Sequence, residues 1–477
     1  MRAASRVLVR SESSLAVGVG MCLALGGLSL GVPSGMGYDS WAWLVWGREV
    51  LHFSLDTEGG PSWKPLPVIL IAPFTPLEDV APAIWLGFSR AAAFAALLLA
   101  YRVASRIAGS RLAGVVAAAA LALSADFFVT ALRGYSEPLL IALALAAIDQ
   151  HLAQRRLVVL TLVAFAGLLR PEVWIFGAIY GCFLAIADGR FSSTRARFRV
   201  IALVAVTPAS WLTTDLLGSG NPLEASKVAT TAPQGSAAKS SAPAVTVVER
   251  AGDAVILPVV VLFLVALGVA IWRAVGRRRG DGTDRAVMWL AGLALGWIMV
   301  VATMAEVGYA GRRRYLALAA AIMCVVAAIA LVTMISRLPH QRIRHMALGA
   351  AVLAFVLFGF SPARADYRLI SLAAEQESQN DELGDAVVRA GGPDRVAMLG
   401  SAVINPFLHT ALAWKLDQPL RRVRPTWSSS RRKPNWSTPA VLFRAPPRLA
   451  GPRPAIPRDI ATRQIARAGR WRVVTAR

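Results

Sequence analysis

The sequence predicts an all-α polytopic membrane protein with a small α/β domain at its C-terminal end, and two observations carry this prediction. The 477 residues are 56% hydrophobic with a mean hydropathy of +0.53, and several windows exceed the roughly 18 apolar residues that a transmembrane helix needs. After residue 362 the chain becomes polar and rich in Pro and Arg. We therefore expect a membrane domain over residues 1–362 and a C-terminal domain over 363–477.

About eleven transmembrane helices are expected, at residues 14–34, 81–102, 111–128, 136–153, 157–169, 173–187, 200–217, 254–273, 286–305, 314–335 and 346–362. The interval 157–187 could also be one long helix, but a single span would place the basic segment 188–199 on the outer side, so we favour two. Two spans that share about 30 residues at roughly 1.5 Å each are too short to cross fully. Their junction at 170–172 should lie below the outer surface and line a cavity.

Most of the formal charge of +23 lies in short loops beside apolar segments. This is the positive-inside pattern, which indicates orientation and gives no reason to expect a nucleic-acid partner. We expect a cytoplasmic N-terminus bearing Arg2, Arg6 and Arg10, and an extracytoplasmic C-terminal domain at the plasma membrane. No small-residue cleavage site follows the first apolar run closely, so that helix is predicted to be retained. The Ala- and Arg-rich composition is typical of a high-GC bacterium.

The first outer loop, residues 35–80, is polar and rich in Trp. Within it, Trp43, Trp46, Val50 and Phe53 follow one another at spacings of three and four. This periodicity predicts a short helix over 41–53 that lies in the membrane interface, where Trp side chains are half-exposed at headgroup level. The tryptophans could form an interfacial belt or a platform on which sugars stack.

An acid and a cation bracket this helix. Asp39 precedes it, and Lys64 follows it after a Gly-Gly-Pro turn. Held at a membrane surface, the two could act on a lipid-linked anionic substrate. Two simpler roles are open, since Asp39 could cap the helix and Lys64 could extend to the headgroups as an anchor.

Ionisable residues within spans are costly and usually functional, and here they gather toward the outer half of the membrane. They are Arg90 in the second span, Arg133 and Glu137 around the third-to-fourth turn, Arg170 and Glu172 at the junction, and Arg312, Arg313, Arg314 and Tyr315 at the start of the tenth span. Arg and Lys bind phosphate oxygens, and a carboxylate can accept the proton of an attacking hydroxyl. A cavity with these groups suits transfer to or from a phosphate-bearing substrate.

Structural roles remain open for the same residues. Arg170 with Glu172 could be an ion pair at a broken helix, and Arg133 with Glu137 has the four-residue spacing of another. The arginines at 312–314 could be a collar that binds headgroups. Cys22, Cys182 and Cys324 all fall inside predicted spans, which excludes a disulfide framework and a cysteine metal site.

These residues resemble the GT-C superfamily of membrane glycosyltransferases, in the branch of the protein O-mannosyltransferases and the lipid A aminoarabinose transferase. In that branch an acid follows the first transmembrane helix, and a Lys/His-Pro-Pro-Leu motif closes the first outer loop. This chain has Asp39-Ser40 where the family commonly has two acids, and WKPLP at 63–67 without the double proline. Arg-Pro-Glu at 170–172 and Arg-Arg-Tyr-Leu at 313–316 also resemble family elements, so the resemblance covers roughly residues 14–335.

The resemblance implies a GT-C-like fold and a role for each matching residue. Asp39 would be the catalytic base for the acceptor hydroxyl, and Lys64 with the arginines at 312–314 would hold the donor phosphate. The remaining substrate-binding positions would be Arg90, Arg133, Glu137, Arg170, Glu172 and Tyr315. A second acid is missing at Ser40, and the sequence gives no support for a divalent cation or another cofactor.

In the C-terminal domain, strand-like runs occur at 395–399, 440–443 and 471–475. The segment 421–436 is basic and aromatic. It could be a solvated surface loop, or it could contact anionic lipid or a polyanionic glycan.

The function implied is inverting transfer of a sugar, mannosyl or arabinosyl among others, from a polyprenyl-phosphate donor. The acceptor would be a cell-envelope glycan, lipid or protein at the outer face of the plasma membrane. A non-enzymatic carrier or flippase for a lipid-linked sugar is the alternative, since it would use the same basic cavity without a base. Carriers often have interrupted helices in two matching halves, and only one interruption, at 170–172, is evident here. A scaffold whose C-terminal domain binds a partner is a third possibility.

Overall fold

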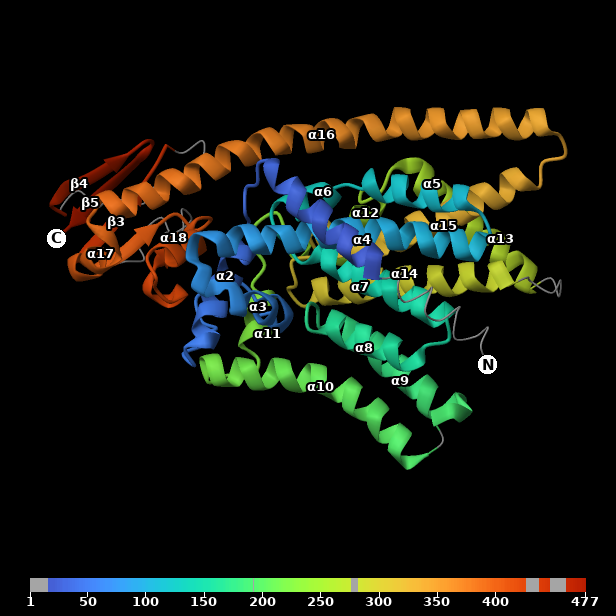
Figure 1. Ribbon diagram of the computed structural model, residues 1–477, viewed down its shortest axis with the longest axis horizontal. Coiled ribbons are helices and arrows are strands. Elements are labelled where there is room, and N and C mark those ends of the chain that lie inside the picture. The colour runs from blue at the N-terminus through green and yellow to red at the C-terminus, as the bar shows by residue number, and fades with distance from the viewer. Residues whose placement is uncertain (1–15, 192, 276–281, 426–436, 447–459) are drawn as a thin grey trace.

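The computed structural model describes residues 16–191, 193–275, 282–425, 437–446 and 460–477. Most of the described chain is helical, and the long helices run side by side along the long axis of the molecule (Figure 1). A small sheet lies at one end of this bundle. The basic residues predicted at the cytoplasmic N-terminus, before residue 11, lie outside the described residues.

Six helical segments of the described residues are long and apolar enough to cross a membrane. Four of them are single helices: α10 (Thr194–Ser219), α13 (Leu257–Val275), α14 (Gly282–Glu306) and α16 (Gln341–Arg389). The segment Pro65–Ala108 joins α3 (Pro65–Ile71), η2 (Ala72–Val80) and α4 (Ala81–Ala108). The segment Arg313–Ser336 joins η5 (Arg313–Leu316) and α15 (Ala317–Ser336). Shorter apolar helices are Ala16–Gly31, which ends in η1 (Ser29–Gly31), α5 (Arg111–Ala122), α8 (Arg156–Gly167) and α9 (Val173–Ala187). With α7 (Glu137–Leu152), every predicted span falls on a helix, and the protein is a multi-pass membrane protein.

Short elements connect these helices. They are α6 (Phe127–Leu132), η3 (Gly189–Phe191), α11 (Glu224–Ala229), η4 (Ala237–Lys239) and α12 (Pro243–Gly252). The last three belong to the polar segment between α10 and α13. Arg250 of α12 donates to the carbonyl of Gly311 at 2.8 Å, which ties this segment to the loop that precedes η5.

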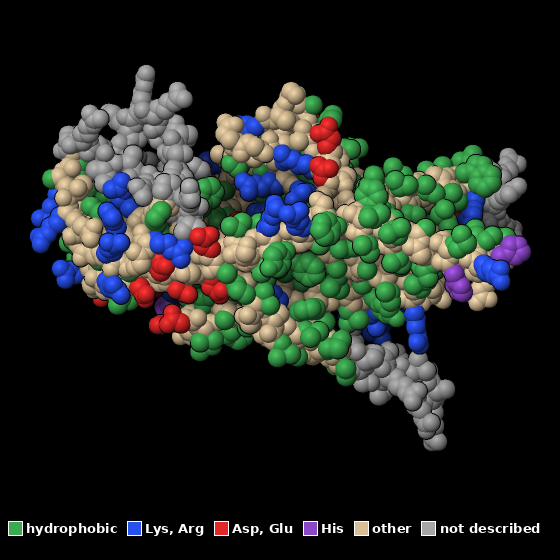
Figure 2. Space-filling model, turned by 90° about the horizontal axis from the view of Figure 1, so that it is seen from above, with side chains coloured by type: hydrophobic (Ala, Val, Ile, Leu, Met, Phe, Trp, Pro, Cys, Tyr) green, Lys and Arg blue, Asp and Glu red, His purple; other side chains and the backbone are tan. Residues whose placement is uncertain are grey.

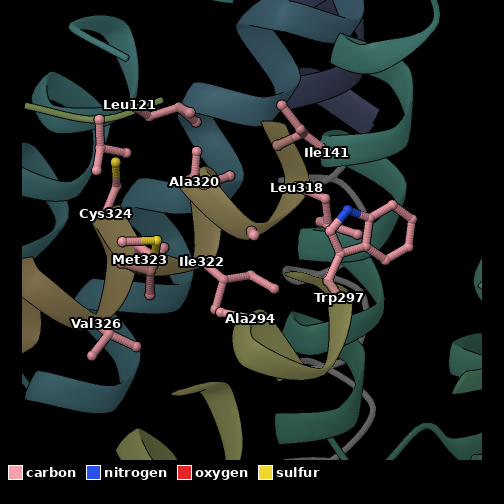
Figure 3. Close-up of a cluster of buried hydrophobic side chains, with 14 of the residues drawn as sticks. Leu121, Ile141, Ala294, Trp297, Leu318, Ala320, Ile322, Met323, Cys324 and Val326 are labelled. Atoms are coloured by element: carbon pink, nitrogen blue, oxygen red, sulfur yellow. The ribbon is translucent and has the colours of Figure 1, made fainter. Parts of the chain in front are cut away.

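Helix α15 is the centre of the membrane bundle. It packs against α4, α5, α7, α13 and α14, and it is buried on nearly every side (Figure 3). Its many alanines let neighbouring backbones approach closely, as is common in membrane interfaces. Larger side chains such as Trp297 and Leu121 fill the space around it.

The interval 157–187 forms two helices, α8 and α9, as predicted. The helices break at Arg170-Pro171-Glu172, where proline cannot donate a backbone hydrogen bond. Arg170 and Glu172 are 3% and 2% exposed, so both charges lie in the protein interior. Irregular backbone at membrane depth is tolerated in such a place.

Helix α2 (Tyr38–Leu51) corrects the prediction of an interfacial helix. Trp43 and Trp46 are fully buried, whereas Phe53 is 99% exposed and follows the end of the helix. The helix is covered on one side by α3 and η2, and on the other by α18 (His409–Lys415) of the C-terminal domain. Its tryptophans are therefore core residues, and neither a membrane belt nor a sugar platform.

Helix α16 runs unbroken for 49 residues and crosses the boundary predicted at 362/363. Its C-terminal part packs on the C-terminal domain through Leu383, Ala386 and Val387. The run 395–399, predicted as a strand, belongs instead to α17 (Gly392–Leu399), which begins with a proline in its first turn. Proline there is favourable for a helix.

The C-terminal sheet has the strand order β2-β1-β3-β5-β4. Its strands are β1 (Ser401–Ile404), β2 (Arg424–Pro425), β3 (Ala440–Arg444), β4 (Thr462–Ala468) and β5 (Trp471–Ala476), which confirms the strands predicted at 440–443 and 471–475. Strand β1 pairs in parallel with β2 and β3, and β5 pairs antiparallel with β3 and β4. Of the predicted basic loop, 421–425 form the end of η6 (Leu420–Arg422) and β2, and 426–436 lie outside the described residues.

Candidate active site

Asp39 lies in the first turn of α2, and Gly37 occupies the N-cap position, so Asp39 is not the helix cap. A side chain on Gly37 would meet the ring of Tyr135 at 2.6 Å, which explains the glycine. The backbone N–H of Gly37 donates to the carbonyl of Arg133 at 2.9 Å. The Ser40 hydroxyl also bonds the carbonyls of Arg133 and Gly134, at 2.9 and 2.8 Å. The turn before α7 thereby fixes the start of α2.

Three acids and three cations from five segments meet beside this turn. We call Asp39, Lys64, Glu137, Arg170, Glu172 and Arg314 the ionic cluster. Arg314 Nη2 donates to Asp39 Oδ2 at 3.0 Å, and Arg314 Nε lies 3.9 Å from Glu137 Oε1. On the other side of Glu137, Arg170 Nη2 donates to the same Oε1 at 2.5 Å.

Tyr309 extends the cluster to Glu172. Arg170 Nη1 donates to the Tyr309 hydroxyl at 2.7 Å, and that hydroxyl donates to Glu172 Oε1 at 2.7 Å. Arg170 also lies over the ring of Tyr315, at 4.2 Å from the centroid, and Arg314 lies over the ring of Tyr135 at 4.1 Å. The aromatic faces favour the cationic form of both arginines.

Lys64 reaches the cluster from the end of the first outer loop. It is 9% exposed, its Nζ donates to the Ser136 hydroxyl at 3.1 Å, and it lies 5.4 Å from the centre of the Trp43 ring. Lys64 is therefore not a headgroup anchor. Burial lowers its pKa to about 8, with repulsion from Arg170 adding to the effect and Glu137 opposing it.

Asp39 is the accessible acid of the cluster. Its side chain is 14% exposed, compared with 1% for Glu137 and 0% for Glu172. Burial alone would raise the pKa of Asp39, but Arg314 and Lys64 hold it below the usual value. The carboxylate is therefore ionised at neutral pH, with one oxygen bound by Arg314.

The cations of the cluster have donors to spare. Nε and Nη1 of Arg314 and Nε of Arg170 are buried and have no hydrogen-bond partner among the described residues. The ammonium group of Lys64 has three N–H groups, and among the described residues it donates to one side chain, the hydroxyl of Ser136. Buried donors without a partner are costly, so a ligand that supplies oxygen acceptors would be stabilised here.

The other predicted site residues lie outside this cluster. Arg90 donates to the carbonyls of Ser29 and Val32, so it caps the end of the first helix. Arg313 forms a bidentate ion pair with Asp126: its Nε donates to Oδ2 at 2.8 Å and its Nη2 donates to Oδ1 at 2.9 Å.

Two more predicted cations flank the cluster without joining it. Arg312 is exposed, and Arg133 is half-buried. Neither side chain forms an ion pair within the described part of the chain, and Arg133 does not pair with Glu137.

An apolar cavity of about 120 Å³ adjoins the cluster on the side of the membrane interior. Leu140, one turn after Glu137, and Val173, next to Glu172, line it. Trp297 and Leu318, close to Tyr315 in the fold, also line it, and the indole of Trp297 donates to the Tyr315 carbonyl at 2.8 Å. A charged site and an apolar cavity thus lie side by side.

Sequence reasoning missed Tyr135, Ser136 and Tyr309, which shape the cluster, and it gave Trp43 a place in the membrane interface instead of beside Lys64. Tyrosine and serine are common in loops and carry no charge, so they do not stand out from apolar spans as charged residues do. One signal was present, because Tyr135 and Ser136 stand beside Glu137 and Tyr309 lies three residues before Arg312.

No protein-family model and no curated protein matches this sequence. Solved structures match the fold. ArnT from Cupriavidus metallidurans bound to undecaprenyl phosphate superposes with a TM-score of 0.56, 13% identity, and 97% of this chain and 98% of that chain covered. The apo form of the same ArnT superposes with a TM-score of 0.53 and 14% identity, and the match covers 98% of each chain. The Archaeoglobus fulgidus oligosaccharyltransferase tethered with an acceptor peptide superposes with a TM-score of 0.51 and 13% identity. The match covers 84% of this chain and 63% of that chain.

The chain has the GT-C fold. ArnT and the oligosaccharyltransferase share this fold, and at such low identity the match establishes the architecture alone. It confirms the fold class expected from the sequence, a helical membrane domain followed by a small C-terminal domain.

The GT-C branch that the sequence resembles commonly has a second acid after the first, where a metal could bind. In this chain that position is Ser40, whose hydroxyl bonds two backbone carbonyls, and Asp39 pairs with Arg314. Within the described residues no three His, Cys, Asp or Glu side chains are grouped as metal ligands. This donor set does not fit a divalent cation, because a guanidinium occupies the place beside the carboxylate.

Proposed function

We propose that this GT-C protein is a glycosyltransferase that moves a sugar from a polyprenyl-phosphate donor to a cell-envelope glycan, lipid or protein. The reaction takes place at the outer face of the plasma membrane and inverts the anomeric centre. The observation that carries the proposal is the accessible carboxylate of Asp39, held 3.0 Å from Arg314 beside Lys64 in a buried ionic cluster. A carrier would have no need of an acid in that place.

The phosphate of the donor binds Lys64 and Arg314. Lys64 is buried and Arg314 is half-buried, and both have spare N–H donors that can bind phosphate oxygens. Undecaprenyl phosphate is bound to ArnT, which has the same fold, and this likeness supports the assignment.

The part of the isoprenoid chain next to the donor phosphate enters the apolar cavity between α7, α8, α9, α14 and α15, whose volume of about 120 Å³ holds only a short length of that chain. The cavity is lined by Leu, Val, Ala and aromatic side chains, and it adjoins the ionic cluster. A ligand with an anionic head and an apolar tail matches both parts. This arrangement favours a lipid-linked donor over a water-soluble nucleotide sugar.

The chemistry follows from these positions. The acceptor hydroxyl attacks the anomeric carbon from the face opposite the phosphate, and its proton passes to the carboxylate of Asp39. The bond between the anomeric carbon and the phosphate oxygen breaks, and the electron pair leaves with the lipid phosphate. Lys64 and Arg314 stabilise the charge that develops there.

The test is sugar transfer by the purified protein in nanodiscs. Radiolabelled polyprenyl-phosphate mannose and arabinose are supplied with a crude envelope fraction, and label in the acceptor is measured. Transfer from one donor supports the proposal. Donor binding without transfer, across several donors, would favour the carrier instead.

A further inference from the structure

Cationic residues are concentrated in the last sixty residues of the chain. Between residues 418 and 477 the sequence has fifteen Arg and Lys residues and a single acid, Asp459. Figure 2 shows Lys and Arg side chains gathered at the sheet end of the molecule, whereas hydrophobic side chains dominate the other end. A charge of this size on a small domain indicates an anionic partner.

Three of these arginines form a row across the sheet. Arg444 of β3 lies opposite Arg472 of β5, and Arg472 lies opposite Arg467 of β4. Cross-strand partners project from the same face with Cβ atoms roughly 5 Å apart. The arginine row (Arg444, Arg467 and Arg472) therefore places the Cβ atoms of three arginines on one face of the sheet within about 10 Å.

Among the described residues, nothing in the fold explains the two exposed members of this row, Arg467 and Arg472. Like charges directly opposite each other destabilise a sheet. Arg467 could protect the edge strand β4 against strand addition, but Arg472 lies on β5, between β3 and β4, where no edge needs protection. Among the described residues, no acid pairs with Arg467 or Arg472, whereas Arg470 pairs with Glu382 at 3.0 Å.

The row lies far from the membrane. Arg364 is the first charged residue after the apolar part of α16, and Arg389 at the end of α16 donates to the carbonyl of Arg467 at 3.2 Å. The 25 residues between them rise about 38 Å at 1.5 Å each. Helix α16 runs parallel to the helices of the bundle and leads to the sheet at the end of the molecule (Figure 1). The distance along α16 is therefore measured along the bundle axis, away from the bilayer. It exceeds the headgroup layer of roughly 5–8 Å and the Debye length of about 8 Å, which excludes lipid headgroups.

The three strands that carry the row have no exposed aromatic side chain on which the bases of a nucleic acid could stack. The aromatic residues of the three strands, Phe443 and Trp471, are 1% and 0% exposed. Single-stranded nucleic acids bind such grooves through exposed aromatic rings.

We propose that the arginine row binds a linear polyanionic glycan, with a phosphate or carboxylate on each repeating unit. Guanidinium groups bind both anions through paired hydrogen bonds, and a repeating polymer engages several of them at once. The basic residues around the row add long-range attraction. This surface is independent of the proposed transferase activity and lies on a different part of the molecule from Asp39.

The test is binding of fluorescent polygalacturonate to the full-length protein in phosphatidylcholine nanodiscs. Arg467→Gln with Arg472→Gln is compared with Arg337→Gln with Arg342→Gln, which removes the same charge beside the opposite end of α16. We expect the first pair to raise Kd about tenfold and to flatten the salt dependence of Kd, and the second pair to change neither. The salt dependence of wild-type binding is a second measurement that needs no variant.

Neutral dextran, oligo(dT) and phosphatidylglycerol vesicles are the comparison ligands. The proposal is overturned if wild type binds polygalacturonate no more tightly than any of them. It is also overturned if salt leaves the wild-type Kd unchanged, or if both double variants retain wild-type affinity.

Discussion

The hydroxyl of Tyr38 lies 3.2 Å from Nδ1 of His409, although 371 positions separate the two residues in the sequence. Nε2 of His409 lies 2.8 Å from the carbonyl of Leu420, which requires a proton on Nε2 and leaves Nδ1 to accept from the tyrosine. The next residue, Thr410, donates to the Tyr38 carbonyl at 2.9 Å. The C-terminal domain is thus fastened to the turn of α2 that carries Asp39.

Removing these two hydroxyls should loosen that turn. We expect Tyr38→Phe with Thr410→Val to lower the free energy of unfolding by about 1–3 kcal/mol, because two buried hydrogen bonds are lost. The rate of sugar transfer should fall while donor affinity stays near wild type, since the donor-binding cations are untouched. Thermal unfolding and single-turnover transfer measure the two effects. Unchanged transfer in a destabilised variant would mean that the contact serves folding alone.

The centre of the ionic cluster should be far more sensitive than its rim. Arg170→Met would leave Glu172 buried without a cation and Glu137 with Arg314 alone at 3.9 Å, which costs about 3–5 kcal/mol. Arg313→Gln removes a half-exposed pair with Asp126 and should cost about 0–1 kcal/mol. Thermal unfolding in one detergent compares the two variants. Equal losses would contradict the buried charge network.

Lys64→Met should weaken donor binding about tenfold or more, because a buried cation facing the phosphate is lost while the apolar stem remains. Arg313→Gln is the matched control, since its guanidinium is occupied by Asp126. Because the pKa of Lys64 is lowered to about 8, wild-type affinity should also fall as pH rises through 8 and the lysine loses its proton. Binding of labelled polyprenyl phosphate between pH 6 and 9 checks both, and a flat pH profile would remove Lys64 from the phosphate site.

Glu49 should make the protein less stable at alkaline pH. Its side chain is buried beneath the C-terminal domain, and burial raises its pKa to about 7 from 4.5. The folded state therefore binds this proton more tightly than the unfolded state, and stability falls as pH rises from 4.5 through 7. Glu49→Gln should abolish about 1–3 kcal/mol of this dependence. Denaturant unfolding between pH 5 and 8 measures the pH dependence of the free energy of unfolding. The same pH dependence in Glu49→Gln and wild type would refute the role given to Glu49.

The charged members of the site could be predicted from the sequence because charges stand out in apolar segments. Asp39, Lys64, Glu137, Arg170 and Arg314 come from distant segments, yet each is an ionisable group beside an apolar span, near the end predicted to face outward. Arg90 has the same signature, yet its side chain bonds carbonyls at the end of the first helix, and no sequence pattern distinguishes a phosphate ligand from such a side chain.

The burial of α2 could not be predicted. Periodicity indicates that Trp43 and Trp46 share a face, but it does not say what covers that face. The covering residues belong to α18, more than 350 positions away in the sequence. Likewise, the change to a polar, Pro- and Arg-rich sequence after residue 362 predicted the end of the last span there, whereas α16 continues to Arg389 and packs against the C-terminal domain.

The central claim is that Asp39 is the base, and the most direct test compares sugar transfer by wild type, Asp39→Asn and Asp126→Asn. Asparagine keeps the size of the side chain and removes its basicity, and Asp126 is a control acid paired with Arg313 outside the cluster. We predict that Asp39→Asn lowers the transfer rate by about 10²–10⁴-fold with donor affinity nearly unchanged, while Asp126→Asn remains active. Equal transfer by wild type and Asp39→Asn would contradict the claim and move the base elsewhere in the cluster.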